Sequence, residues 1–163
     1  MIKFKIKNPK KLNDKNMRTF FKKRGLADLI QSNDKKGKKV NEMVLSKPYK
    51  PEIRDLYNLY SYIILNKRIT VLEFGSGWSS LVIALALDEL KKKYSKEVAN
   101  LRRNNPFELF ILENEKKFLN ITRKKLGNFV KKNNIKIKIN YHFSNVRMTK
   151  YNNRIASEYV KLP

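Results

Sequence analysis

The segment VLEFGSGWSS, residues 71–80, decides the fold, because an apolar run ends in it and an amphipathic run begins in it. The β-branched and apolar residues 69–74 predict a short strand that is covered on both faces, as is usual in parallel sheets. Two glycines then turn the chain. Apolar residues recur at helical spacing over 78–103, and an Asn-Asn-Pro sequence stops the pattern. The segment therefore predicts a strand, a tight turn and a helix.

The rest of the chain continues this alternation. Residues 107–112 predict a second strand that ends at Glu113, residues 115–132 a second helix, and residues 135–143 a third strand. A further helix is expected over 52–66, ahead of the first strand. Alternating strands and helices are typical of parallel sheets with right-handed crossovers, so we expect an α/β fold.

The third predicted strand differs from the first in its pattern. Its apolar residues alternate with lysine, asparagine and the single histidine, His142. A strand with one solvated face belongs at the margin of a sheet. We therefore expect a Rossmann-like partial parallel sheet in the order 3-2-1, with flanking helices.

The chain divides into two parts by composition. Residues 1–47 are expected to form a basic N-terminal arm that carries a helix capped near Asp14, and residues 48–163 the Rossmann-like, cofactor-binding domain. Residues 157–163 fall where a fourth strand would begin, so the domain is expected to be incomplete at its C-terminus. The free edge of the first strand would then be paired by another chain or by Ile2–Ile6, unless the product is truncated.

Composition excludes several kinds of protein. The 163 residues contain no cysteine and one histidine, which excludes disulfide scaffolds, thiolate catalysis and multi-histidine metal centres, so no metal site is expected. No apolar run is long enough for a membrane span, and the start lacks the apolar region of a secretory signal, so a cytoplasmic protein is expected. The net charge of +24 reflects either an AT-rich coding sequence or an attraction to nucleic acid or other anionic surfaces.

The candidate site follows the first two strands. Gly75-Ser76-Gly77 lets the backbone approach a ligand, and the helix that follows offers amide donors to an anionic or polar group. Glu113, at the end of the second strand, is placed to accept hydrogen bonds from two vicinal ribose hydroxyls. The non-functional alternative is a glycine turn that binds no ligand, with Glu73 and Glu113 merely solvated at strand ends.

On these residues the sequence resembles the class I S-adenosylmethionine-dependent methyltransferases. Their first motif is an acidic residue followed by Gly-x-Gly, here Glu73-Phe74-Gly75-Ser76-Gly77, and their second is the acid that ends strand two, here Glu113. The resemblance covers about residues 48–145 and implies S-adenosyl-L-methionine as cofactor. It implies that Glu73, Gly75, Ser76 and Gly77 line the methionine end, that Glu113 holds the ribose, and that Ser144 or Asn145 lies near the adenine.

Three functions are compatible with the sequence. The first is a methyltransferase, or the cofactor-binding half of one, acting on an unidentified acceptor through catalytic residues that the sequence does not reveal. The second is a non-catalytic basic protein that binds nucleic acid. The third is a nucleotide-dependent oxidoreductase, although Ser80 stands where dinucleotide-binding enzymes usually keep a third glycine.

Overall fold

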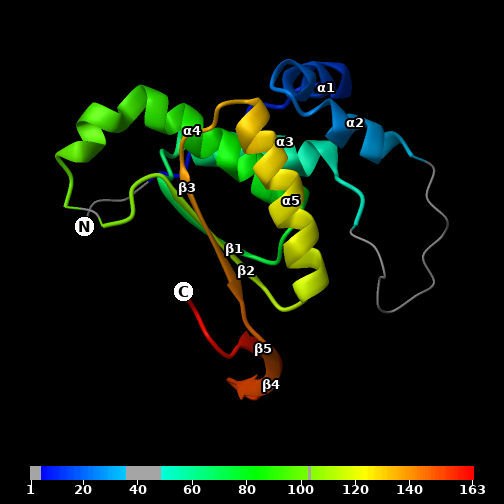
Figure 1. Ribbon diagram of the computed structural model, residues 1–163, viewed down its shortest axis with the longest axis vertical. Helices are drawn as coiled ribbons and strands as arrows, with labels where there is room; N and C mark the ends of the chain where they lie inside the picture. Colours follow the sequence, from blue (N-terminus) through cyan, green and yellow to red (C-terminus); the bar gives the residue numbers. More distant parts are fainter. Residues whose placement is uncertain (1–4, 36–48, 103) are drawn as a thin grey trace.

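The computed structural model describes residues 5–35, 49–102 and 104–163 (Figure 1). Its central element is a sheet of three parallel strands, and its helices surround one face of that sheet. The elements are α1 (Asp14–Lys23), α2 (Ala27–Asp34), α3 (Ile53–Leu65), β1 (Thr70–Phe74), α4 (Trp78–Ala99), β2 (Glu108–Glu113), α5 (Lys116–Lys132), β3 (Lys138–Phe143), β4 (Val146–Tyr151) and β5 (Arg154–Tyr159).

The parallel sheet confirms the expected α/β class. Its strands are in the order β1-β2-β3, so β2 lies between the other two, and the expected order 3-2-1 names the same neighbours from the opposite edge. Glu73 pairs with Ile111, and Ile111 pairs with Tyr141, so these side chains share one face. The carboxyl ends of all three strands consequently meet at one rim.

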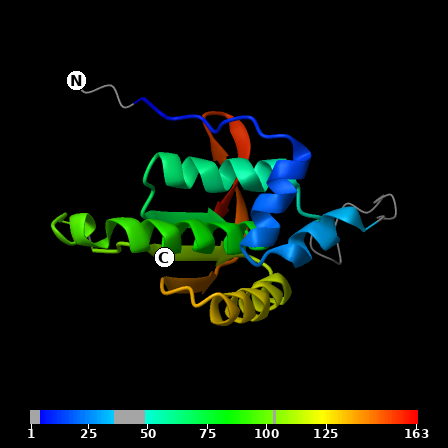
Figure 2. The ribbon, with the colours of Figure 1, turned by 90° about the horizontal axis from the view of Figure 1, so that it is seen from above.

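The helices cover one face of this sheet. Figure 2 shows α3, α4 and α5 side by side, and both α3 and α5 contact α4. Leu109 and Ile111 of β2 are fully buried against this helical layer, which completes the hydrophobic core. The two crossovers run in the same direction across the sheet, and right-handed crossovers of that kind place their helices on the same side.

The face of β1 that points away from the helices is open, which corrects one expectation. The first strand was expected to be covered on both faces, but Leu72 is 41% exposed and Phe74 is 61% exposed. These two side chains alternate with Glu73 and so point away from the helical layer. The continuous apolar run of β1 was correctly assigned as a strand, but no helix of the described residues packs over its outer face.

The helices before residue 35 belong to the same core. Met17, Phe21, Leu26 and Leu29 of the α1–α2 region are buried with the residues of α3 and α4. The backbone between the helices turns at Gly25, whose φ is +76°. The expected boundary at residue 47 lies outside the described residues, as do Ile2 and Phe4 of the segment considered as an edge strand.

The last two strands form a separate antiparallel hairpin that the sequence analysis did not foresee. β4 pairs with β5, and the two-residue turn between them is Asn152-Asn153, with φ values of 47° and 60°. Two residues with positive φ make the turn type that suits the twist of a hairpin, and asparagine tolerates this region better than most residues. The hairpin lies beyond the carboxyl rim of the main sheet (Figure 1).

Candidate functional site at the carboxyl rim of the sheet

The glycine loop joins β1 to α4 and ties two strands together at the rim. Gly75 has a φ of +88°, a region that favours glycine, and its amide donates a hydrogen bond of 2.8 Å to the Leu112 carbonyl of β2. The Gly77 amide donates to Ser80 Oγ at 3.2 Å, which caps the first turn of α4. A Cβ at either glycine would meet no atom within 4 Å, so the loop borders open space.

Glu73 lies under this loop and not in the open space. Its carboxylate accepts hydrogen bonds from the hydroxyls of Ser79 and, at 2.6 Å, Ser80. Burial raises the pKa of Glu73 to about 7, the two serine hydroxyls oppose that rise, and the nearby Glu113 carboxyl adds to it. Glu73 therefore anchors the first turn of α4 to β1, which is a positioning role.

Glu113 lies at the rim and is held in one orientation. Its Oε1 accepts the amides of Asn114 at 2.9 Å and Glu115 at 3.1 Å, where α5 begins. Its Oε2 accepts a 2.7 Å hydrogen bond from Ser76 Oγ, which in turn accepts one from Thr122 Oγ1 at 3.2 Å. The glycine loop and the acid of β2 are thus connected directly at the rim.

A cavity of about 410 Å³ opens beside this connection. The sequence-predicted residues that line it are Gly75, Ser76, Gly77 and Glu113, and its other walls come from residues 49–56, the start of α4 and Phe118 of α5. Among the residues that the structure describes, three acidic residues line it, Glu52, Asp55 and Glu113, together with one lysine, Lys50, whose ammonium donates to the Lys35 carbonyl. The cavity is therefore acidic within a chain of net charge +24.

Three residues that the resemblance assigned to the site do not line this cavity. Glu73 is withdrawn beneath the loop. Ser144 is buried, and its Oγ accepts the Lys161 amide at 2.8 Å. Asn145 is exposed, and its carbonyl accepts the Val160 amide at 2.9 Å. Both residues after β3 thus hold the returning end of the hairpin to the rim.

This returning end brings Tyr159 to the rim, which the sequence analysis missed. The ring centroids of Tyr159 and Phe74 are 5.6 Å apart. Burial raises the pKa of the Tyr159 phenol, the Glu113 charge adds to this, and a hydrogen bond with the Gly75 backbone opposes it. The Asn152-Asn153 pair between alternating residues was the sequence signal for this hairpin.

Trp78 and His142 have different surroundings. Trp78 is half-buried against the core and also lines the cavity, and the Lys125 ammonium lies 3.7 Å from its ring centroid. His142 lies on the open face of the sheet, stacked on Phe110 with centroids 6.1 Å apart. The sequence placed His142 on the polar face of its strand, and its ring is half-buried there.

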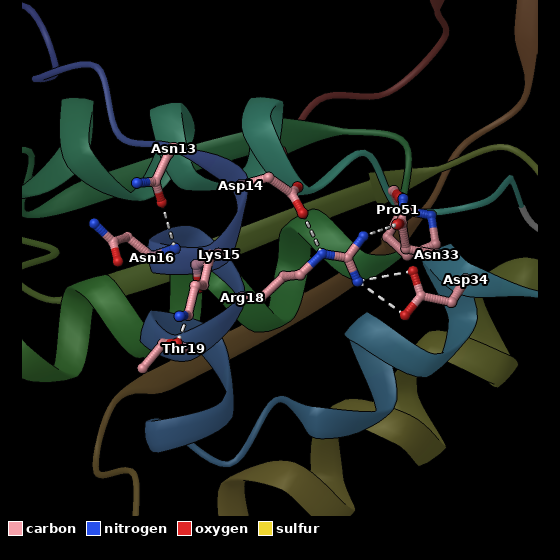
Figure 3. Close-up of polar contacts among 9 residues, drawn as sticks. All are labelled: Asn13, Asp14, Lys15, Asn16, Arg18, Thr19, Asn33, Asp34 and Pro51. Atoms are coloured by element: carbon pink, nitrogen blue, oxygen red, sulfur yellow. Dashed lines mark hydrogen bonds and ion pairs between the residues drawn. The ribbon is translucent and has the colours of Figure 1, made fainter.

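A second hollow, of about 380 Å³, lies beside α1 and is bordered by Arg18 and Asp14. Arg18 donates to Asp14 and, at 2.8 Å, to both oxygens of Asp34, which links α1 to α2 (Figure 3). Arg18 and the two aspartates pair with one another and belong to helix packing, while the other charged residues that border the hollow, Lys15 and Lys22, leave it basic. The rim cavity is therefore the better candidate for a ligand site.

Comparisons with protein-family models, curated proteins and solved structures find no match to this chain. Among the described residues, no helix combines the length and the apolar character needed to cross a bilayer.

Proposed function

We propose that this chain is a Rossmann-like, methyltransferase-type protein that binds S-adenosyl-L-methionine in the rim cavity and serves methyl transfer to an unidentified acceptor. The observation that carries the proposal is the lining of this cavity. Gly75, Gly77 and Glu113 border one space of about 410 Å³ at the carboxyl ends of parallel strands. Such rims are where open α/β sheets bind their ligands.

The residues at the rim suit the adenosyl group. The fixed carboxylate of Glu113 offers Oε2 to a ribose hydroxyl, which would replace the Ser76 hydroxyl that donates to it now. The empty space above both glycines leaves room for the ligand at the backbone. Hydrogen bonds of this charge-assisted kind contribute about 1.5–3 kcal/mol each.

The charge of the cavity favours S-adenosylmethionine over a dinucleotide as its ligand. S-adenosylmethionine carries two cationic groups, a sulfonium and an ammonium, and one carboxylate, whereas a dinucleotide carries an anionic pyrophosphate. Glu52 and Asp55 would attract the cationic groups. The acidic lining opposes a pyrophosphate, which makes the oxidoreductase the weaker alternative.

The loop amides support the same choice. Pyrophosphate sites use free amides at the glycine turn. Here the Gly75 and Gly77 amides donate to Leu112 and Ser80, so neither is available to a phosphate oxygen. Bound S-adenosylmethionine would supply an already activated methyl group, so the protein's task is to hold donor and acceptor in line and to exclude water.

Isothermal titration with S-adenosylmethionine, S-adenosylhomocysteine and NADH tests the proposal. We expect heat with both sulfur ligands and none with NADH. Glu113→Gln should weaken binding about 10- to 100-fold, as expected for the loss of a charge-assisted hydrogen bond. The matched control is Glu115→Gln, two residues away and exposed, which should leave the affinity unchanged.

Two further variants test the charge of the cavity and the backbone conformation of the glycine loop. Asp55→Asn should reduce the preference for the sulfonium ligand over its neutral thioether product, because one attracting charge is lost. Gly75→Val should abolish binding, since a β-branched residue does not tolerate the φ of +88°. Gly127→Ala, on the exposed side of α5, is the control for replacing a glycine and should leave binding unchanged. Heat with NADH alone, or none with the sulfur ligands, would contradict the proposal.

A further inference from the structure

The helix α5 (Lys116–Lys132) has an extreme charge. Its 17 residues include six lysines, one arginine and no acidic residue. α1 and α4 are also rich in lysine, but both contain acidic side chains, such as Asp14 of α1 and Glu89 of α4, that form ion pairs with arginines. The positive charge on α5 is thus not balanced within its own helix.

The apolar side of α5 is committed to the core. Leu119, Leu126 and Phe129 are buried, and Val130 packs against the same cluster. The side that faces solvent presents lysines together with Asn120 and Asn128. A helix that lies in a membrane surface needs an exposed apolar side, so an anionic bilayer is not the partner that this surface fits.

Six of the seven cations of α5, all except Lys117, fall into two groups. Lys116, Arg123 and Lys125 lie over aromatic rings, at 5.0, 4.9 and 3.7 Å from the centroids. Lys124, Lys131 and Lys132 have neither a ring nor a carboxylate as partner among the described residues. Lys124 and Lys131 are seven residues apart, which places them on one side of the helix, about 10.5 Å apart along its axis.

We propose that the solvent side of α5, with Lys124, Lys131 and Lys132 in its C-terminal half, binds the phosphate backbone of a nucleic acid. A linear row of exposed cations matches a linear row of phosphates, and the asparagine amides between them can donate to phosphate oxygens. The proposal does not depend on the identity of the cavity's ligand.

Fluorescence anisotropy with a labelled single-stranded RNA and a labelled DNA duplex tests this inference in the full chain. Binding is measured between about 50 and 200 mM salt, because the slope of log K against log[salt] reports how many phosphates are neutralised. The triple variant Lys124→Gln/Lys131→Gln/Lys132→Gln should lower the magnitude of that slope by about 2 on RNA or about 2.7 on duplex DNA. The arm with the higher wild-type affinity identifies the nucleic acid.

The matched control removes the same charge elsewhere. Lys10→Gln/Lys11→Gln/Lys15→Gln changes three exposed lysines at the start of α1 and should leave the slope close to that of the wild type. Equal losses in both triple variants would overturn the proposal, because the effect would then be one of net charge. Competition by polyglutamate as effective as that by RNA would also overturn it, in favour of an acidic protein partner.

A second triple variant guards against misfolding. Lys124→Arg/Lys131→Arg/Lys132→Arg keeps the charge, so this variant should retain wild-type affinity and slope. Loss of binding in the arginine variant, with an unchanged melting temperature, would show that the charge of this helix is not what the nucleic acid recognises.

Discussion

Replacing Glu73 by glutamine should abolish much of the pH dependence of stability. The carboxyl is 8% exposed, and its pKa is raised from 4.5 to about 7. Glutamine has the same shape and can still pair with the hydroxyls of Ser79 and Ser80. The substitution therefore removes the titration and keeps the packing.

Whether stability rises or falls with pH follows from the direction in which the pKa of Glu73 is shifted. The folded state holds the Glu73 proton more tightly than the unfolded state, so this group stabilises the fold at low pH. That stability is lost as the pH rises from 4.5 through about 7. Between about pH 5 and about pH 8 the loss amounts to about 2.5 kcal/mol, at about 1.36 kcal/mol for each unit of pKa.

Urea unfolding followed by the fluorescence of Trp78, the single tryptophan, measures this difference. The wild-type unfolding free energy should fall more steeply with pH than that of Glu73→Gln, by about 2.5 kcal/mol over the stated range. Glu115→Gln, on an exposed carboxyl, should follow the wild type. Parallel curves for wild type and Glu73→Gln would refute the reasoning, because Glu73 would then be ionised in the folded protein throughout.

Two stability predictions concern the packing of the helices. Glu89→Leu removes the acceptor of the Tyr60 hydroxyl and of Arg24 Nε (3.0 Å), and should cost about 1–3 kcal/mol in urea unfolding, with Tyr60→Phe in the same background recovering part of the loss. Gly25→Ala should cost about 1 kcal/mol or more, because φ is +76° and the new Cβ would lie 2.4 Å from Asn133 Oδ1. Asn133→Gly should relieve only the contact, and full recovery in the double variant would contradict the strain argument.

The local elements could be predicted from the sequence because each has its own periodic pattern. The apolar run before Gly75 and the alternation before Ser144 identified β1 and β3, and the observed bounds, Thr70–Phe74 and Lys138–Phe143, fall within the predicted ranges. The glycine loop and Glu113 each follow the end of a predicted strand, which placed both at one rim. Parallel strands have their carboxyl ends together, so this much of the site follows from the strand order.

The sequence pattern could not show where each polar side chain turns at that rim. Glu73 and Glu113 both end strands on the same face, yet only Glu113 lines the cavity, because the serines of α4 engage Glu73. Ser144 is likewise drawn to the end of the hairpin, whose Lys161 amide it accepts. These pairings join different elements of the fold, across 7 residues for Glu73 and Ser80 and 17 for Ser144 and Lys161, so they depend on how those elements are placed relative to one another.

The sequence by itself determined the parallel strands, the glycine turn and the basic character of α5, since spacing and charge are properties of a continuous segment. Only the tertiary structure decided that β1 is open on one face and that the rim cavity is acidic. Residues 49–56, which supply two of the cavity's three carboxylates, reach the rim because α3 packs on α4. The packing of helices against a sheet brings these charges together, and no local pattern encodes it.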